Sequence, residues 1–105
     1  MSVILTLRVT GDPKALEQMA KAEPEKFAKI MESAKSHGLI AHRFYGSEGK
    51  IMALDEWPDP ESFQAFWAEN ESDIGPMMQQ VATSEPEIAF WTKLDTGDDV
   101  GWEGA

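Results

Sequence analysis

Apolar and polar residues alternate over residues 3–9, which is the pattern of a strand with one buried face. After Pro13 the apolar positions recur every three or four residues, as on the buried side of a helix. Asp12 can accept hydrogen bonds from the free N–H groups of a first helical turn, so the helix is expected to begin here. Pro24 should divide it into two abutting helices, and Gly38 should end the second.

A similar order of elements returns in the second half of the chain. Residues 39–45 and 50–57 are predicted to be two strands of a hairpin, because glycines flank two short β-favouring runs. If the loop of residues 46–49 pairs Tyr45 with Lys50, His42 should lie beside Ala53. A second helical segment is expected to begin at Pro60 and to break near Pro76. Residues 88–94 are predicted to form the last strand.

The phrase ILTLRVTGDP, residues 4–13, is echoed without a gap by IMALDEWPDP, residues 51–60. Two such βα halves give the order βαββαβ, which predicts an α+β, ferredoxin-like fold with a four-stranded antiparallel sheet and its helices on one face. Right-handed crossovers are expected to make the first and third strands parallel neighbours at the centre of the sheet.

Aligning the two phrases assigns side chains to the two faces of the sheet. Leu5 and Leu7 match Met52 and Leu54, and all four should lie under the helices. The opposite face should carry Ile4, Thr6, Arg8, Ile40, His42, Phe44, Ile51, Ala53, Asp55 and Trp57. That face is too apolar to be left in water, and a two-fold homodimer would bury it because one patch then serves both partners.

Composition narrows the functional classes. The chain has 105 residues, of which 42% are hydrophobic, so one domain with a modest core is expected over residues 1–94. The acidic tail, residues 95–105, either frays or is anchored on a neighbouring surface by Trp102. A net charge of −10 should repel nucleic acid and anionic membranes.

Several chemistries lack the residues that they need. There is no cysteine, which excludes disulfides and thiolate metal sites, and the two histidines show no zinc-binding spacing, so no metal is expected. No apolar run approaches the roughly 20 residues that cross a bilayer, and the start of the chain lacks the pattern of a signal peptide. A cytoplasmic protein is therefore the default expectation.

The charged residues Arg8, His42 and Asp55 are expected to lie close together on the face assigned to the dimer. One interpretation is a hydrogen-bonded network that fixes how the two subunits dock, since buried charges are usually paired. The other is catalytic: a histidine beside a carboxylate can take a proton from an acidic carbon or a phenol, and an arginine can stabilise the oxyanion. Spacing alone leaves both open.

Aromatic residues supply the candidate ligand-binding positions. Phe66 and Trp67, with Phe63, form a stripe at helical spacing that is most simply core but could wall an apolar pocket. Tyr45 and Trp91, near the ends of their strands, are amphipathic candidates of the same kind.

The βαββαβ order and the phrase IMALDEWPDPESFQAFW together resemble the antibiotic biosynthesis monooxygenase-like proteins of the dimeric α/β-barrel superfamily. The resemblance spans residues 1–94, and Asp55 and Trp57 would occupy the family's acid-x-aromatic positions. It implies a homodimer whose two sheets face each other, with an apolar pocket between sheet and helices in each subunit. Some relatives oxidise polycyclic phenols with oxygen and neither metal nor flavin, and others bind or degrade haem.

One departure from the family bears on function. Relatives often carry a histidine on the second helix, where this chain has Phe66 and Trp67, so a haem ligand is missing there. The working hypothesis is therefore a protein that binds a small aromatic or polyketide-like molecule and, in its catalytic form, oxygenates it without a cofactor. In that scheme the residue chemistry described above makes His42 the base, Asp55 its orienting partner and Arg8 the oxyanion donor. The strand assignment places His42 at the dimer seam. The alternative is a non-catalytic dimeric ligand-binding or accessory protein in which these residues only hold the sheets together.

Overall fold

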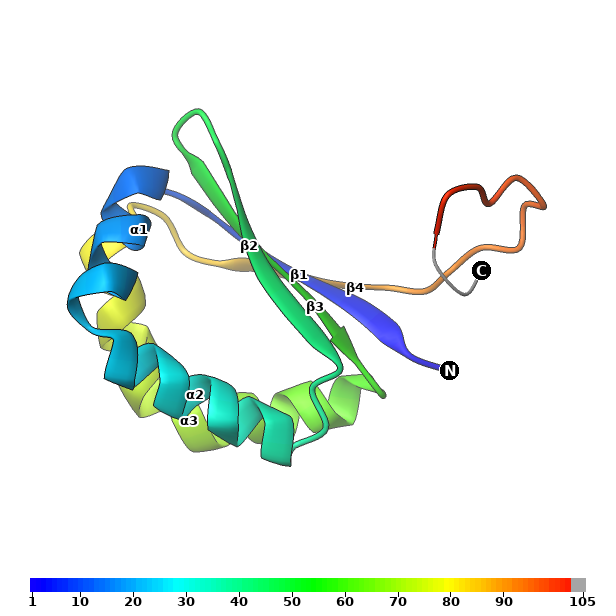
Figure 1. Ribbon diagram of the computed structural model, residues 1–105, viewed down its shortest axis with the longest axis horizontal. Coiled ribbons are helices and arrows are strands. Elements are labelled where there is room, and N and C mark those ends of the chain that lie inside the picture. Colours follow the sequence, from blue (N-terminus) through cyan, green and yellow to red (C-terminus); the bar gives the residue numbers. More distant parts are fainter. Residues whose placement is uncertain (103–105) are drawn as a thin grey trace.

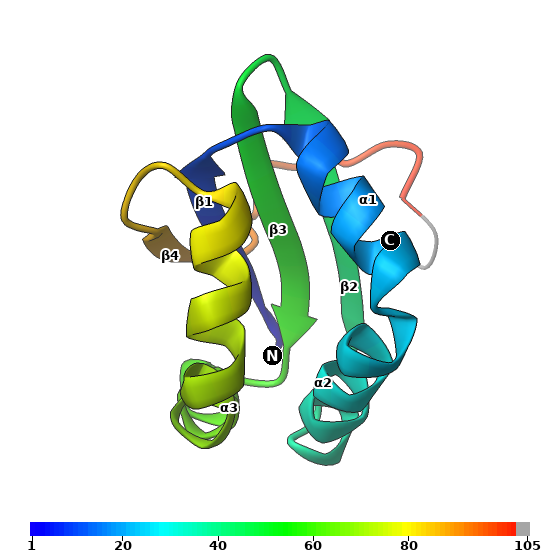
Figure 2. The ribbon, with the colours of Figure 1, turned by 90° about the vertical axis from the view of Figure 1, so that its left-hand side faces the viewer.

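The computed structural model describes residues 1–102. The elements in chain order are β1 (Val3–Thr10), α1 (Pro13–Ala22), α2 (Pro24–Ser36), β2 (Ala41–Ser47), β3 (Lys50–Trp57), α3 (Pro60–Val81) and β4 (Glu87–Trp91). The strands form one sheet in the order β2-β3-β1-β4, and each neighbouring pair is antiparallel. The helices cover one face, with α1 and α2 on one side and α3 on the other (Figures 1 and 2). The predicted α+β, ferredoxin-like fold is confirmed.

The two Asp-Pro phrases begin helices as predicted. The Asp12 carboxylate accepts a hydrogen bond from the Lys14 backbone N–H at 3.0 Å, at the start of α1. The Asp59 carboxylate accepts one from the Ser62 N–H at 2.8 Å, at the start of α3. The hydrogen bonds from the Ser62 hydroxyl and N–H lower the pKa of Asp59. Both phrases therefore end a strand and start a helix by the same device.

Helix α3 continues through the position where a break was expected. Pro76 lies inside the helix and cannot donate a backbone hydrogen bond, so the prediction of an interruption is wrong. The helix persists because Ile74, Met78 and Val81, on both sides of Pro76, pack against the hydrophobic core. Tertiary packing here outweighs a local preference against helix.

The first and third strands run antiparallel, so the predicted parallel pairing is also wrong. Leu5 lies opposite Asp55, and Leu7 lies opposite Ala53. Because paired residues point to the same face, the β3 side chains assigned to the uncovered face instead lie under the helices, namely Ile51, Ala53, Asp55 and Trp57. Met52 and Leu54 point to the uncovered face. The physical reason is that β3 lies between β1 and β2, which are parallel to each other, and is antiparallel to both.

The β2–β3 hairpin differs from its predicted register by two residues, since Ser47 rather than Tyr45 pairs with Lys50. A shift of two keeps each side chain on its face. His42 therefore lies opposite Asp55, and the two turn toward the helices together. The expectation that His42 lies at a dimer seam is thus wrong.

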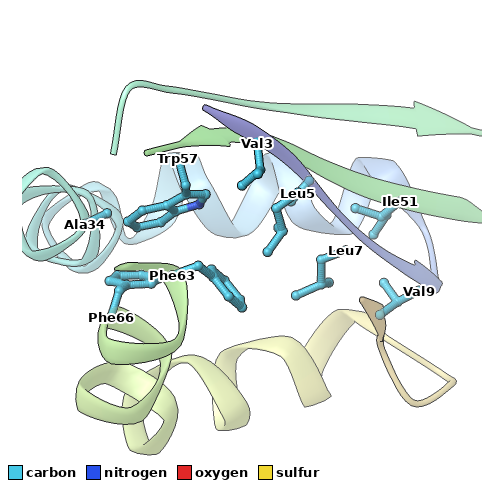
Figure 3. Packing of buried hydrophobic residues seen from close by; sticks show 10 residues of the cluster. Val3, Leu5, Leu7, Val9, Ala34, Ile51, Trp57, Phe63 and Phe66 are labelled. Carbon is cyan, nitrogen blue, oxygen red and sulfur yellow. The ribbon is translucent and has the colours of Figure 1, made fainter. Parts of the chain in front are cut away.

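Trp57 is one of the largest side chains of the core and is fully buried. Its ring centroid lies 5.8 Å from that of Phe63 and 5.4 Å from that of Phe66, both on α3. Figure 3 shows these rings at one end of the core, beside Ala34 of α2, with Leu7 and Val9 toward the other end. The buried hydrophobic residues are Val3, Leu5, Leu7, Val9, Ala34, Ile51, Ala53, Trp57, Phe63 and Phe66.

A polar network joins α2 to α3 at this end of the core. The Asn70 side-chain amide donates to the Ser33 hydroxyl at 2.8 Å, and that hydroxyl donates to the Glu69 carboxylate at 2.9 Å. The His37 Nε2 atom lies 2.8 Å from the same carboxylate oxygen. Hydrogen bonds from His37 and Ser33 lower the pKa of Glu69. This α2–α3 network fixes the two helices against each other.

Beyond β4, residues 92–102 contain neither helix nor strand, and Trp102 is 77% exposed. The last three residues of the predicted acidic tail, 103–105, lie outside the described residues. Within residues 1–102, no helix combines the length and the apolar character that crossing a bilayer requires.

Replacing Glu69 by glutamine should weaken the fold in a pH-dependent way. The folded-state pKa of Glu69 lies below its ordinary value of 4.5, so its stabilising effect is complete above that pH and is lost as the pH falls through the folded value. Urea unfolding should therefore show native protein more stable than Glu69→Gln at pH 7, with the difference shrinking toward pH 3. Glu71→Gln, an exposed position on the same helix, is the control; a difference for Glu69→Gln that is equal at both pH values would contradict the argument.

Candidate functional site

A partly open cavity of about 140 Å³ lies between the helix-covered face of the sheet and the three helices. Its lining is almost entirely apolar and includes methionines from helices on both sides, among them Met19, Met31, Met77 and Met78. Of the described residues that line this pocket, only His42 and Asp55 have ionisable side chains. The pocket therefore has one polar point in an otherwise apolar wall.

That polar point is a directly hydrogen-bonded pair. The His42 Nδ1 atom lies 2.6 Å from the Asp55 Oδ1 atom, and the two side chains are only 18% and 10% exposed. The Trp57 indole N–H donates to the other carboxylate oxygen of Asp55 at 3.2 Å. Both oxygens of this buried carboxylate thus have donors, which offsets the cost of burying its charge.

The pairing also assigns the proton on the imidazole. An ionised carboxylate only accepts hydrogen bonds, so the neutral His42 ring must donate through Nδ1. The other nitrogen, Nε2, then carries a lone pair. The His42 ring is further held edge-to-face against Phe44, with ring centroids 4.8 Å apart. The arrangement is that of an oriented general base.

Local sequence explains why these side chains meet. Asp55 and Trp57 are two apart on one strand, so both point to the same face of the sheet. His42 is the direct cross-strand partner of Asp55 in the β2–β3 hairpin. Three side chains of one hairpin therefore build the polar part of the pocket. Within residues 1–102, no cluster of acidic or imidazole groups is arranged to hold a metal ion.

The structure brings together four of the predicted site residues and separates three. Phe66 and Trp67 line the pocket with His42 and Asp55. Arg8, Tyr45 and Trp91 point to the opposite side of the sheet, here called the outer face, which also carries Ile4, Thr6, Met52 and Leu54.

The predicted contact between Arg8 and Asp55 is therefore wrong. The Arg8 guanidinium pairs instead with the Glu87 carboxylate of β4 at 3.1 Å. The Trp91 indole N–H donates to the Thr6 hydroxyl at 2.8 Å, on the same outer face. The sheet itself separates these side chains from the pocket, so neither Arg8 nor Trp91 can touch a ligand held beside His42.

Sequence reasoning missed the role of Trp57 as a donor to Asp55 and the methionine-rich wall. The acid-x-aromatic spacing carried the signal for Trp57, because residues two apart on a strand share a face. For the methionines no signal separated a pocket wall from a core, since both need apolar residues at helical spacing.

Neither a protein-family model nor a curated protein sequence matches this chain. Solved structures do match it. SnoaB, described as a cofactor-independent oxygenase from Streptomyces nogalater, shares 17% sequence identity; the match covers 93% of this chain and 98% of that one, with a TM-score of 0.65.

Two further structures show the same likeness. A monooxygenase from the gene ActVA-Orf6 of Streptomyces coelicolor, solved with the ligand nanaomycin D, is 9% identical over 90% of this chain and 89% of that one, with a TM-score of 0.69. A dimeric ferredoxin-like protein from an uncultured marine organism is 14% identical over 90% of this chain and 89% of that one, with a TM-score of 0.66. The chain thus has the fold of the antibiotic biosynthesis monooxygenase-like proteins, as its sequence predicts.

Proposed function

We propose that this protein binds a small aromatic molecule between its sheet and helices and oxygenates it with O₂, without metal or flavin. The observation that carries the proposal is the oriented His42–Asp55 pair at the one polar point of an apolar pocket. The fold likeness to SnoaB, which is described as a cofactor-independent oxygenase, supports the reaction class.

In this reaction the Nε2 atom of His42 takes a proton from a phenol or an acidic carbon of the substrate. Asp55 holds the ring in place and stabilises the imidazolium that forms. The substrate anion, with its charge delocalised onto carbon, gives one electron to O₂, and the two radicals combine into a C–O–O bond. The peroxide then collapses: one oxygen atom stays as a new carbonyl, and the other leaves as water with the two hydrogens lost from the substrate.

The apolar wall assists these steps in two ways. It excludes water, which would otherwise return a proton to the substrate anion. It also offers a favourable environment to O₂ and to an aromatic ring, since both are apolar. The methionine side chains are flexible enough to adjust to the outline of the ligand.

A specific observation favours a second candidate, a ligand-binding protein without catalysis. Within residues 1–102, no lysine or arginine side chain lines the pocket, so a cationic donor for an oxyanion is missing. Arg8, expected in that role, lies on the outer face. In this second reading His42 only hydrogen-bonds the ligand.

Replacing His42 by alanine separates the two candidates. Oxygen uptake in air, measured with acidic phenols and anthrones of one to three rings and no added cofactor, should fall about a hundredfold or more, because the base is removed. Asp55→Asn should also lower it, since an amide no longer fixes which imidazole nitrogen carries the proton.

His37→Ala is the matched control, because His37 is the only other histidine and lies in the α2–α3 network outside the pocket lining. Its oxygen uptake should equal that of the native protein. If the native protein binds these compounds but consumes no oxygen, oxygenation is refuted and the ligand-binding function is supported.

The proposal includes a homodimer that buries the outer face. Tyr45 and Trp91 are 46% and 54% exposed there, at opposite edges of the sheet, and Met52 and Leu54 lie between them on the central strand β3. An apolar patch of this kind on one side of a sheet is typical of a protein interface, and a two-fold axis lets the same patch serve both chains. One similar structure is described as a dimeric ferredoxin-like protein.

Leu54→Lys should therefore produce a monomer. Light scattering of the native protein should give the mass of two chains, and a lysine at the centre of the outer face would place an unpaired charge in the interface. Gln18→Lys, on the exposed side of α1, adds the same charge elsewhere and should leave the dimer intact. His42→Ala should leave it intact as well, because His42 faces the pocket; a native monomer at micromolar concentration would refute the assembly.

A further inference from the structure

We infer that the pocket selects an electrically neutral molecule with a single aromatic ring and an acidic hydroxyl group, held by a hydrogen bond from that hydroxyl to His42 Nε2. This inference rests on the proposed binding function and narrows it to a substrate class. Size, charge and hydrogen bonding support it independently.

The size of the cavity favours a ligand of one ring. An apolar cavity of about 150 Å³ is enough to bind benzene. The pocket offers about 140 Å³ between sheet and helices, so one ring fills it. A ligand with three fused rings would either leave rings exposed to water at the open side of the cavity or push α3 away from α1 and α2, and the α2–α3 network fixes α2 and α3 against each other at one end.

The charge of the pocket excludes anionic ligands. Asp55 already places one negative charge in its wall, and no cationic side chain of residues 1–102 lines it. The arginines of the outer face, Arg8 and Arg43, are separated from it by the sheet. A carboxylate or phosphate would therefore lose its water without gaining a counter-ion, which is costly. The whole chain, with a net charge of −10, adds to the repulsion.

The hydrogen-bonding groups of the pocket favour a donor on the ligand. Both oxygens of Asp55 are occupied, by the His42 ring and the Trp57 indole, so the carboxylate is already satisfied. The Nε2 atom of His42 is left as an acceptor. A phenol, whose pKa is about 10, is neutral near pH 7 and donates through its hydroxyl. It thus meets the size, charge and hydrogen-bond conditions together.

The test uses four probes with the native protein under nitrogen: p-cresol, toluene, p-toluate and anthrone. The first three share one shape and differ in having a hydroxyl, no polar group or a carboxylate, and anthrone has three rings. Binding is followed by the indole N–H signals of the four tryptophans in ¹⁵N-labelled protein. Trp57 and Trp67 line the pocket, whereas Trp91 lies on the outer face and Trp102 is exposed in the tail, so these last two are internal references.

The expected result is that p-cresol shifts the Trp57 and Trp67 signals and leaves the Trp91 and Trp102 signals in place. It should bind several-fold tighter than toluene, because one neutral hydrogen bond is gained, and at least about tenfold tighter than p-toluate or anthrone. In His42→Phe the advantage of p-cresol over toluene should disappear, whereas in His37→Phe it should remain.

Equal binding of p-toluate and p-cresol, or of anthrone and p-cresol, would overturn the inference, as would shifts at Trp91 or no binding of p-cresol at all. If His42→Phe does not fold, the ranking of the four probes on native protein decides alone. Oxygen uptake is measured separately and keeps the two proposals apart. If the four probes rank as expected but no oxygen is consumed, oxygenation is refuted and the inference about the ligand stands. If anthrone binds tightly and is turned over, the inference about the ligand is refuted and oxygenation stands.

Discussion

The Trp57 side chain joins the packing of this protein to its chemistry. Its ring is fully buried among Phe63 and Phe66 of α3, and its indole N–H donates to Asp55, which in turn holds His42. A buried carboxylate is costly unless its oxygens have donors, so the position of Asp55 depends on a tryptophan that the core holds rigidly. The geometry of the polar pair is therefore set by hydrophobic packing on the far side of Trp57.

Much of the fold could be predicted because the relevant signals are local. Alternating residues marked the strands, and the two Asp-Pro phrases marked the starts of α1 and α3, where the structure has Asp12 and Asp59 as caps. Strand direction could not be read in the same way. The alignment of two similar phrases contains no information on whether their strands run together or in opposition, and that choice decides which side of β3 meets the helices. Pro76 shows the same limit, because only the packed structure reveals that its helix persists.

The predictions for the candidate site were right where they depended on the hairpin and wrong where they depended on the direction of β1 relative to β3. His42 and Asp55 were expected on the same face of the sheet as each other. They do share a face, because an error of two residues in the hairpin register does not change the face to which a side chain points. Arg8 was expected beside them through the parallel alignment of β1 with β3, and the antiparallel pairing sends it to the other side of the sheet, to Glu87. Tyr45 and Trp91 were chosen for their chemistry alone, and only the register shows that they point away from the pocket.

The two partners of the polar pair are separated by only 13 positions in the sequence, across one tight hairpin. Closing so short a loop carries a small entropic cost, so the pair can form early as the chain folds. Its shelter depends on slower, long-range events, since β1 must pair with β3 and with β4 across most of the chain. The hairpin thus brings the two reactive groups near each other first, and the core fixes and encloses them afterwards. A chain arrested between the two stages would expose the imidazole and the carboxylate to water without the support of the packed Trp57.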